Sequence, residues 1–381
     1  MLTELSVKNY RSIYDLHIKL KPVTVILGPN GSGKSNLYKS LSLLSRAARG
    51  DLASAIAEEG GVSSVLWSGR KAKGEKRELS LSVKTDQFQY ELVMGMVPPT
   101  ARGLASFFSG DLDIKKEKVR KVTERGKSLI LKRGRQSLEV KDSNGERLDY
   151  TNKVPLNESV LNRLQEPHKY PELAQIKREL SSWRFYHNLR TDSESPMRMP
   201  QPGVVSPSLS DDGSNLVAVL ATILCGYRRQ EFIEALNQAF PGARVIIKNS
   251  RFALELSLEM QGIRRPLTAW ELSDGTLQFL ALLAILFSPE PPPFIAINEP
   301  ETSIHEDLLE PLARAIVEAS SMSQVWITTH SRLLSDYILD YGGYEEITLE
   351  KVKGKTRLKG YGLDGLSLEE ADDVDDQFDK D

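Results

Sequence analysis

Residues 28–35, GPNGSGKS, have the types and spacing of a phosphate-binding loop, G-x-x-x-x-G-K-[ST]. Glycines let the backbone turn and bring its N–H groups against phosphate oxygens. Lys34 would reach the β- and γ-phosphates of a nucleotide, and the hydroxyl of Ser35 would ligate Mg²⁺. An apolar run, Val23–Leu27, precedes the loop and a helical pattern follows it. A helix N-terminus also favours an anion, so this segment predicts a nucleotide site.

Polar residues follow two other apolar runs that read as strands. Asn298 and Glu299 follow Phe294–Ile297, and His330 closes the run that begins at Val325. At the carboxyl end of a parallel sheet, such side chains lie beside bound phosphates. Glu299 is then a candidate general base for the attacking water, and His330 a candidate hydrogen-bond donor to the γ-phosphate or that water. The alternative for each residue is structural, because either can cap the helix that follows.

The segment Leu272–Thr276, LSDGT, precedes a strongly apolar helix. Ser273 suits the N-cap position, and a carboxylate at Asp274 is favoured in the first turn by the helix dipole. Taken alone, this segment predicts only a capped core helix.

The elements that must position these motifs alternate along the chain. We expect helices at about 34–47, 171–182, 214–226, 229–239, 275–287 and 304–319. Strands are predicted at 2–7, 13–20, 23–27, 79–83, 88–93, 128–132, 137–140, 244–248, 252–258, 294–297 and 325–328. This alternation predicts an α/β fold in which helices cover a mostly parallel sheet.

The net charge of −2 hides two opposed segments. Lys115–Arg135 contains ten Lys or Arg against two Glu, and Asp364–Asp381 contains nine acids and one Lys. The basic segment is suited to a DNA phosphate backbone. A solvated basic hairpin, or one that docks a partner protein or the acidic tail, explains it equally well. The acidic segment is predicted to be a disordered tail.

Composition excludes several other classes of protein. One cysteine, Cys225, permits neither an intramolecular disulfide nor a cysteine zinc site, and the five histidines lack metal-ligand spacing. The longest apolar run, Phe279–Phe287, is too short to span a bilayer, and the N-terminus lacks a signal-peptide pattern. A cytoplasmic protein without a membrane partner is expected.

Six motifs together resemble the ABC-type ATPases of the SMC and RecF kind, and more narrowly the bacterial predicted AAA/ABC-like ATPases. They are NYRS at 9–12, GPNGSGKSN at 28–36, DDGSNL at 211–216, LSDGT at 272–276, INEPETSIH at 297–305 and TTHS at 328–331. The resemblance covers nearly all of residues 1–365. It implies a P-loop ATPase head with an antiparallel β-subdomain. The head would comprise residues 1–95 and 170–365, with a small basic β-rich insertion at 96–169 and a disordered tail at 366–381.

The resemblance also implies roles, with ATP and Mg²⁺ as cofactors. The nucleotide would be bound by Arg11, Gly28, Asn30, Gly31, Ser32, Gly33, Lys34, Ser35 and Asn36. Ser273 and Gly275 would form a signature motif that contacts the γ-phosphate held by a second copy, which implies a head-to-tail homodimer around ATP. Catalysis would use Lys34, Glu299 and the switch histidine His330, while Ser35, and Asn298 through a water, would hold Mg²⁺.

Three positions depart from the family pattern. Asn298 stands where many such ATPases have an aspartate. Asp274 replaces a glycine of the general signature motif, which faces the γ-phosphate. A carboxylate at Asp274 must therefore point away or be neutralised. The glutamine of a Q-loop is not identifiable, because Gln87 and Gln89 are expected in an exposed hairpin.

Two functions follow from these motifs. The first is an ATPase that drives DNA-related work, in repair or phage defence, with a separately encoded effector such as a nuclease. The second is a nucleotide-gated scaffold with slow or absent hydrolysis, which the uncharged Asn298 favours. A transporter ATPase subunit is disfavoured, since no coupling segment is recognisable.

Overall fold

The computed structural model describes residues 1–69, 77–97, 111–124, 126–135, 137–150, 154–250, 253–342, 344 and 346–360. The chain divides into two units. The first unit contains Met1–Lys21, Gly28–Ser182 and the segment from Ile347 onward, and the second contains Pro22–Leu27 and Trp183–Glu346. The predicted acidic tail at 366–381 lies outside the described residues.

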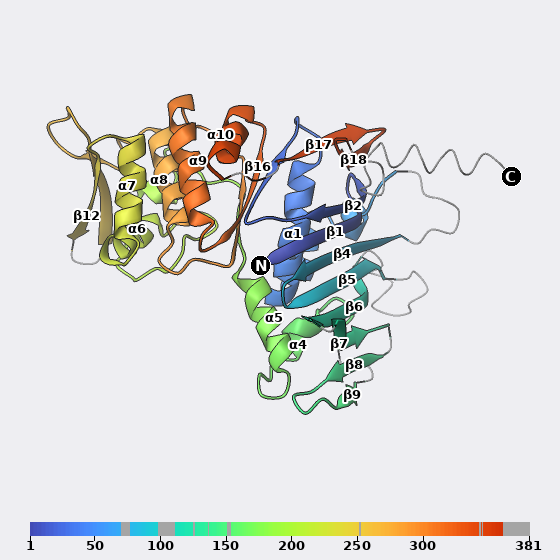
Figure 1. The fold of residues 1–381 in the computed structure, drawn as a ribbon. Helices are drawn as coiled ribbons and strands as arrows, with labels where there is room; N and C mark the ends of the chain where they lie inside the picture. The colour runs from blue at the N-terminus through green and yellow to red at the C-terminus, as the bar shows by residue number, and fades with distance from the viewer. Residues whose placement is uncertain are drawn as a thin grey trace. The chain divides into compact units, whose positions relative to one another are not determined.

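An eight-stranded antiparallel sheet dominates the first unit, with the order β2-β1-β4-β5-β6-β7-β8-β9 (Figure 1). Alternation explains it, because in β4 every second side chain, including Leu79, Leu81 and Val83, is buried. The strands are β1 (Leu2–Tyr10), β2 (Ile13–Lys19), β4 (Glu78–Thr85), β5 (Phe88–Met96), β6 (Leu112–Thr123), β7 (Gly126–Arg133), β8 (Leu138–Lys141) and β9 (Arg147–Asp149). Strands β6–β9 lie in the region expected as an insertion and continue the sheet that β1 begins.

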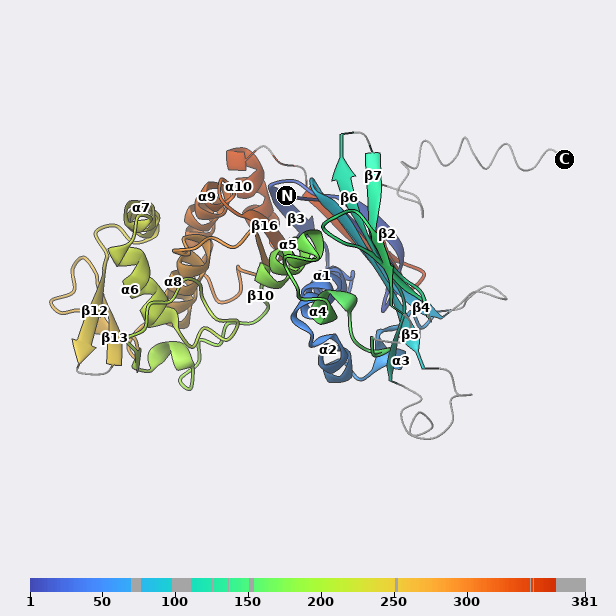
Figure 2. The ribbon, with the colours of Figure 1, turned by 90° about the horizontal axis from the view of Figure 1, so that it is seen from below.

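Helices α1, α4 and α5 lie on one side of this sheet (Figure 2). The helices of the unit are α1 (Lys34–Arg49), α2 (Leu52–Glu58), α3 (Val62–Val65), α4 (Val160–Arg163) and α5 (Pro171–Ser182). Helix α1 ends at Gly50, whose φ of +90° provides the left-handed C-cap. A hairpin of β17 (Glu346–Val352) and β18 (Lys355–Leu358) completes the unit, and β18 contacts β2.

The second unit contains four parallel strands in the order β10-β15-β16-β3. They are β3 (Val23–Leu27), β10 (Arg184–Tyr186), β15 (Phe294–Asn298) and β16 (Gln324–Thr329). All residues of β3 and β16 are buried, as expected for strands covered on both faces.

Helices separate the parallel strands from a small antiparallel sheet in this unit. They are α6 (Leu216–Cys225), α7 (Arg229–Ala239), α8 (Asp274–Leu286), α9 (Leu309–Ala319) and α10 (Arg332–Gly342). The small sheet contains β11 (Gln201–Pro202), β12 (Arg244–Ser250), β13 (Ala253–Glu259) and β14 (Leu267–Thr268). Helix α8 is apolar on all sides and is buried from Leu277 to Leu286.

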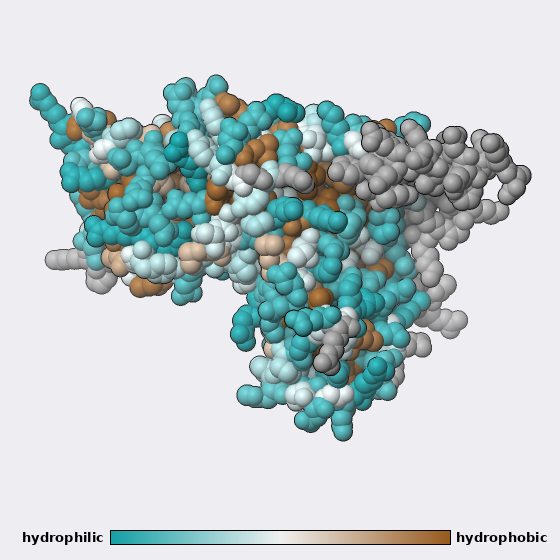
Figure 3. All heavy atoms as spheres, viewed as in Figure 1, coloured by the Kyte–Doolittle hydropathy of each residue, from teal (hydrophilic) through white to brown (hydrophobic). Residues whose placement is uncertain are grey.

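The predicted α/β class is confirmed, together with a parallel and an antiparallel part. The last predicted helix differs, since α9 begins at Leu309 after a 3₁₀ turn, Glu306–Leu308, that His305 caps. The predicted ranges leave out β6, β17, β18 and several short elements, and for α10 the sequence indicated only that a helix follows His330. Hydrophilic side chains predominate on the face drawn in Figure 3. Among the described helices, none is long and apolar enough to cross a membrane.

Candidate functional site

The predicted phosphate loop folds around the ammonium group of Lys34. Gly31 and Gly33 have φ values of +79° and +111°, which side chains with a Cβ rarely adopt. Lys34 is 4% exposed, and its Nζ donates to the carbonyl oxygens of Gly28 at 2.6 Å and Pro29 at 3.3 Å. The loop opens α1, a helix of 16 residues whose N-terminus favours an anion. This geometry suits a polyphosphate.

A residue that the sequence did not single out, Thr356 in β18, braces this loop. Its Oγ1 donates to the carbonyl oxygen of Ser32 at 2.8 Å, and its N–H donates to the carbonyl oxygen of Ser12 at 2.9 Å. The hydroxyls of Ser12 and Thr356 lie 2.8 Å apart, and Nδ2 of Asn36 donates to Oγ of Ser12 at 2.8 Å. Because Thr356 has one proton to give, Ser12 must donate to it. The result is a continuous chain of bonds from Asn36 to Ser32.

Gly33 shows how closely this brace approaches the loop. A Cβ at Gly33 would lie 2.1 Å from Oγ1 of Thr356, so no side chain fits there. The conformation and the contact thus both require glycine at this position.

A cavity of about 730 Å³ lies in the same unit and reaches Asn36, the residue after the loop. Its lining includes Arg11, Ser12, Asn36 and Trp67, and three lysines of the β17–β18 hairpin, Lys351, Lys353 and Lys355. These cations favour an anionic or polyphosphate ligand. Two residues predicted to bind nucleotide, Arg11 and Asn36, therefore face one cavity, while the lysines were not predicted.

Arg11 is held at the cavity by Glu59. Its Nη2 and Nε donate to one carboxylate oxygen of Glu59 at 2.6 and 3.0 Å, and the hydroxyl of Tyr10 donates to the same oxygen at 2.8 Å. Burial, with the neighbouring Glu59 carboxylate, raises the pKa of Tyr10, so Tyr10 remains a donor at neutral pH.

In the second unit, three strands end at one edge of the parallel sheet. Asn298 pairs with Thr328, and Thr329 pairs with Leu27, the residue before the phosphate loop. Oδ1 of Asn298 accepts a hydrogen bond from Oγ1 of Thr328 at 2.8 Å. Glu299 leaves the strand with a φ of +49°, an unusual value for this residue type that directs the chain sharply away from the sheet.

A second carboxylate at this edge, Glu301, binds both Thr329 and His330, and the sequence motifs assigned it no role. Glu301 is 8% exposed, and its Oε1 accepts from Oγ1 of Thr329 at 2.5 Å and from the N–H of His330 at 3.0 Å. Nδ1 of His330 lies 3.2 Å from Oε1 of Glu301 and 3.9 Å from Oε1 of Glu299. The structure thus brings the two predicted catalytic side chains of this unit together, with Glu301 holding the histidine. The two acids in the motif NEPE were the available sequence signal.

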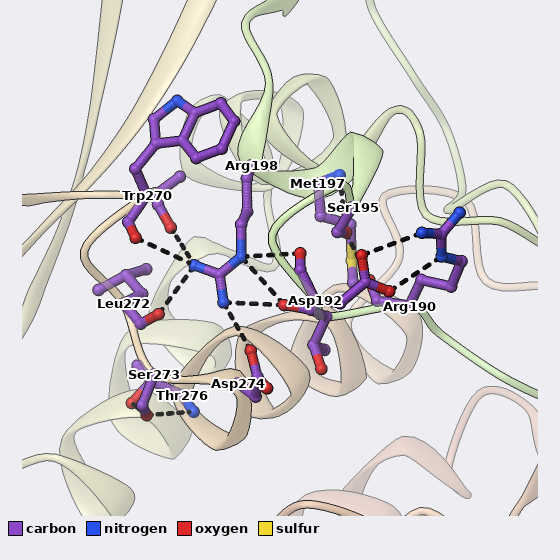
Figure 4. Close-up of polar contacts among 12 residues, drawn as sticks. Arg190, Asp192, Ser195, Met197, Arg198, Trp270, Leu272, Ser273, Asp274 and Thr276 are labelled. Carbon is purple, nitrogen blue, oxygen red and sulfur yellow. Dashed lines mark hydrogen bonds and ion pairs between the residues drawn. The ribbon is translucent and has the colours of Figure 1, made fainter.

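The LSDGT segment caps α8 as predicted. Oγ of Ser273 accepts from the N–H of Thr276 at 3.2 Å, so Ser273 is the N-cap. A Cβ at Gly275 would lie 2.5 Å from the carbonyl oxygen of Ser303, in the turn that follows Glu299 and Glu301. Asp274 forms an ion pair of 2.7 Å with Arg198, which answers how its charge is neutralised (Figure 4).

Many cations of the Lys115–Arg135 segment have acidic partners in the sheet or in α5. Lys115 and Arg135 pair with the buried Asp113, and Arg133 pairs with the buried Glu117. Further ion pairs join Lys118 and Arg120 to Glu91, and Lys121 to Glu172. The surface is therefore less basic than the sequence count indicates.

Gln87 and Gln89, the two glutamines considered for a Q-loop, form hydrogen bonds within the first unit. Oε1 of Gln87 accepts from Gln175 in α5, and Oε1 of Gln89 accepts from Nζ of Lys127 at 3.0 Å. Both side chains thus have structural partners.

Comparisons with known proteins indicate the family and the fold of this chain. Residues 23–336 match a family model described as "AAA domain, putative AbiEii toxin, Type IV TA system". The OLD nuclease of Thermus scotoductus is 43% identical over 44 residues, which are 12% of this chain and only 8% of that nuclease.

Two solved SMC heads share the fold. The head bound to the C-winged helix domain of ScpA has a TM-score of 0.54 at 18% identity, covering 97% of this chain and 99% of that one. A head with an extended coiled coil, derived from Pyrococcus furiosus and bound to the C-terminal domain of ScpA, has a TM-score of 0.51 at 17% identity, covering 100% and 99%. At these identities, the likeness concerns the fold alone.

Proposed function

The chain belongs to the AAA domain family described as a putative AbiEii toxin of a type IV TA system, and from this premise we propose that it binds and hydrolyses ATP. The observation that carries the proposal is the loop around Lys34, with its buried ammonium group, two left-handed glycines and a helix N-terminus. In this role the loop, Arg11 and Asn36 bind the nucleotide, and Lys34 binds its terminal phosphates.

The donor set of this chain also fits Mg²⁺, which accepts hard oxygen ligands. The exposed hydroxyl of Ser35 would hold the ion, and the amide oxygen of Asn298 would contact one of its waters. When bound, the ion would neutralise phosphate charge that develops during transfer. Asn298 brings no charge of its own, so we expect weaker affinity for Mg²⁺ than an aspartate would give.

For hydrolysis, we assign Glu299 as the group that orients and deprotonates water. His330, fixed through Glu301, would donate a hydrogen bond to the γ-phosphate or the water.

The proposed active form is a head-to-tail homodimer in which Ser273 and Gly275 face the γ-phosphate held by the second copy. Movement of this dimer would act on a partner effector in DNA-related work. The two similar SMC heads are each bound to a domain of ScpA, which supports a separate partner for this chain.

Three measurements test this function: phosphate release, ATP binding and mass. The wild type should release phosphate from ATP, Glu299→Gln should be about 10² to 10⁴-fold slower, and Lys34→Ala should fail to bind ATP. Mass measurement of Glu299→Gln should show a monomer without ATP and a dimer with it.

The alternative is a nucleotide-gated scaffold, which Asn298 favours. Equal phosphate release by the wild type and Glu299→Gln, together with ATP-dependent dimerisation, would establish the scaffold and exclude the ATPase. A monomer at saturating ATP would contradict the dimer in both versions.

Double-stranded DNA is the proposed ligand of the cations that remain exposed in the basic segment, among them Lys116, Lys127 and Lys132. Contacts of this kind would be salt-dependent and independent of base sequence.

A further inference from the structure

Arg198 is a buried arginine beside the signature segment. It is the last residue of a 3₁₀ helix, Pro196–Arg198, and is 6% exposed. Charged side chains are rarely this buried unless they have partners. Figure 4 shows its guanidinium group surrounded by carbonyl oxygens and the carboxylate of Asp274.

The guanidinium group joins two segments that are distant in the chain. Its Nη1 donates to the carbonyl oxygens of Ala269 at 2.7 Å and Leu272 at 2.8 Å, immediately before the signature serine. Its Nη2 donates to Oδ1 of Asp274 at 2.7 Å and to the carbonyl oxygen of Thr191 at 2.8 Å. Only the planar fork of arginine supplies donors in all these directions, so lysine is a poor substitute.

The DDGSNL motif at 211–216 has a part in placing this arginine. Gly213 has a φ of +74°, and a Cβ there would lie 2.8 Å from Cγ and Sδ of Met197, the fully buried neighbour of Arg198. Oγ of Ser195 accepts from the N–H of Met197 at 3.2 Å and donates to the carbonyl oxygen of Arg190. Close packing and capping therefore fix the turn from which Arg198 extends.

We propose that Arg198 is a positioning residue that keeps the carboxylate of Asp274 away from the phosphate that the signature segment faces. The inference rests on the proposed function, because only an ATP-bound dimer brings phosphate to this segment. Asp274 follows Ser273 in the first turn of α8 and is 57% exposed on its side chain, so an unpaired charge there would repel phosphate. The pair with Arg198 both directs this carboxylate and compensates its charge.

The experiment measures ATP-dependent dimerisation by mass in the Glu299→Gln background. Arg198→Met should weaken the dimer about 10-fold or more, while ATP affinity of the monomer stays unchanged. Adding Asp274→Asn to Arg198→Met should restore most of the dimer, because the uncompensated charge is then gone. Arg190→Met is the matched control, since Arg190 pairs with Asp192 on the same loop and is exposed.

Each outcome decides one claim. A double variant as weak as Arg198→Met alone, or a full-strength dimer in Arg198→Met, would overturn the inference and leave the proposed function intact. A parent that does not dimerise overturns the proposed dimer and the inference with it, whereas phosphate release still decides the ATPase. If Arg198→Met does not fold, the same comparison is made with the neutral but hydrogen-bonding Arg198→Gln, with and without Asp274→Asn, and the expected rescue is the same.

Discussion

Thr356 braces the phosphate loop with a single buried hydroxyl. The nearly isosteric change Thr356→Val would leave the carbonyl oxygen of Ser32 without its donor and interrupt the bonds that run through Ser12 to Asn36. We expect ATP to bind about 5- to 30-fold more weakly, corresponding to about 1–2 kcal/mol for one unsatisfied buried group. Titration with a fluorescent ATP analogue measures this change.

Thr356→Ser is the control, because it keeps the hydroxyl and loses only a methyl group. Its affinity should stay close to that of the wild type. Equal weakening in both variants would show that the methyl packing, and not the hydrogen bond, supports the loop.

At this scale the sequence revealed those residues that stand in short motifs. The loop, Ser273, Glu299 and His330 each lie in a contiguous pattern, and their functional roles remain predictions. Thr356 and Arg198 do not stand in such a motif. The partners of Thr356 lie 324 and 344 residues away, and those of Arg198 lie up to 76 residues away.

At the scale of elements, Gly275 fixes the contact of α8 with the turn after β15. Alanine usually stabilises a helix relative to glycine, by about 1 kcal/mol. Here its Cβ would lie 2.5 Å from the carbonyl oxygen of Ser303, so we expect Gly275→Ala to destabilise the protein by about 1–3 kcal/mol instead. Thermal unfolding should show a lowered midpoint.

Gly203→Ala serves as its control within the same unit. A Cβ at Gly203 would meet Leu254 at 3.7 Å, an ordinary van der Waals distance. An unfolding midpoint that rises in Gly275→Ala would show that the helix start moves away without cost.

Elements with strong periodicity were predictable, and those that depend on distant packing were not. The alternating residues of β4 and the continuous apolar runs of β3 and β15 identified their strands. The β17–β18 hairpin was missed because its sequence, EITLEKVKGKTRL, is rich in charge. The dipeptide Lys353-Gly354 was the sequence signal that could have identified the turn, and both of its residues have a positive φ in the structure.

At the scale of the whole molecule, the charge segments matter less than their neighbours in space. In the strand register, Lys118 lies opposite Glu91 on one side and Lys132 on the other, and Lys132 lies opposite Glu139. An acidic residue therefore flanks the two lysines on each side. If DNA binds here, Lys116→Ala with Lys132→Ala should lower the slope of log affinity against log salt by about 1 to 2. Filter or anisotropy binding at several salt concentrations measures this slope.

Lys19→Ala is the control, because Lys19 is exposed on β2 of the same sheet. An equal change in slope for Lys19→Ala and for the double variant would indicate a general charge effect, and no slope at all in the wild type would exclude DNA as a ligand.

The pairing of β3 also has a consequence for biosynthesis. Val23–Leu27 belongs to the second unit and pairs with Val325–Thr329, so β3 leaves the ribosome roughly 300 residues before its neighbour. Thr356 is made later still. A nascent chain therefore carries the complete phosphate-binding motif long before the strand and the brace that hold it in place. We expect that nucleotide stabilises the growing protein only after Thr356 has been synthesised.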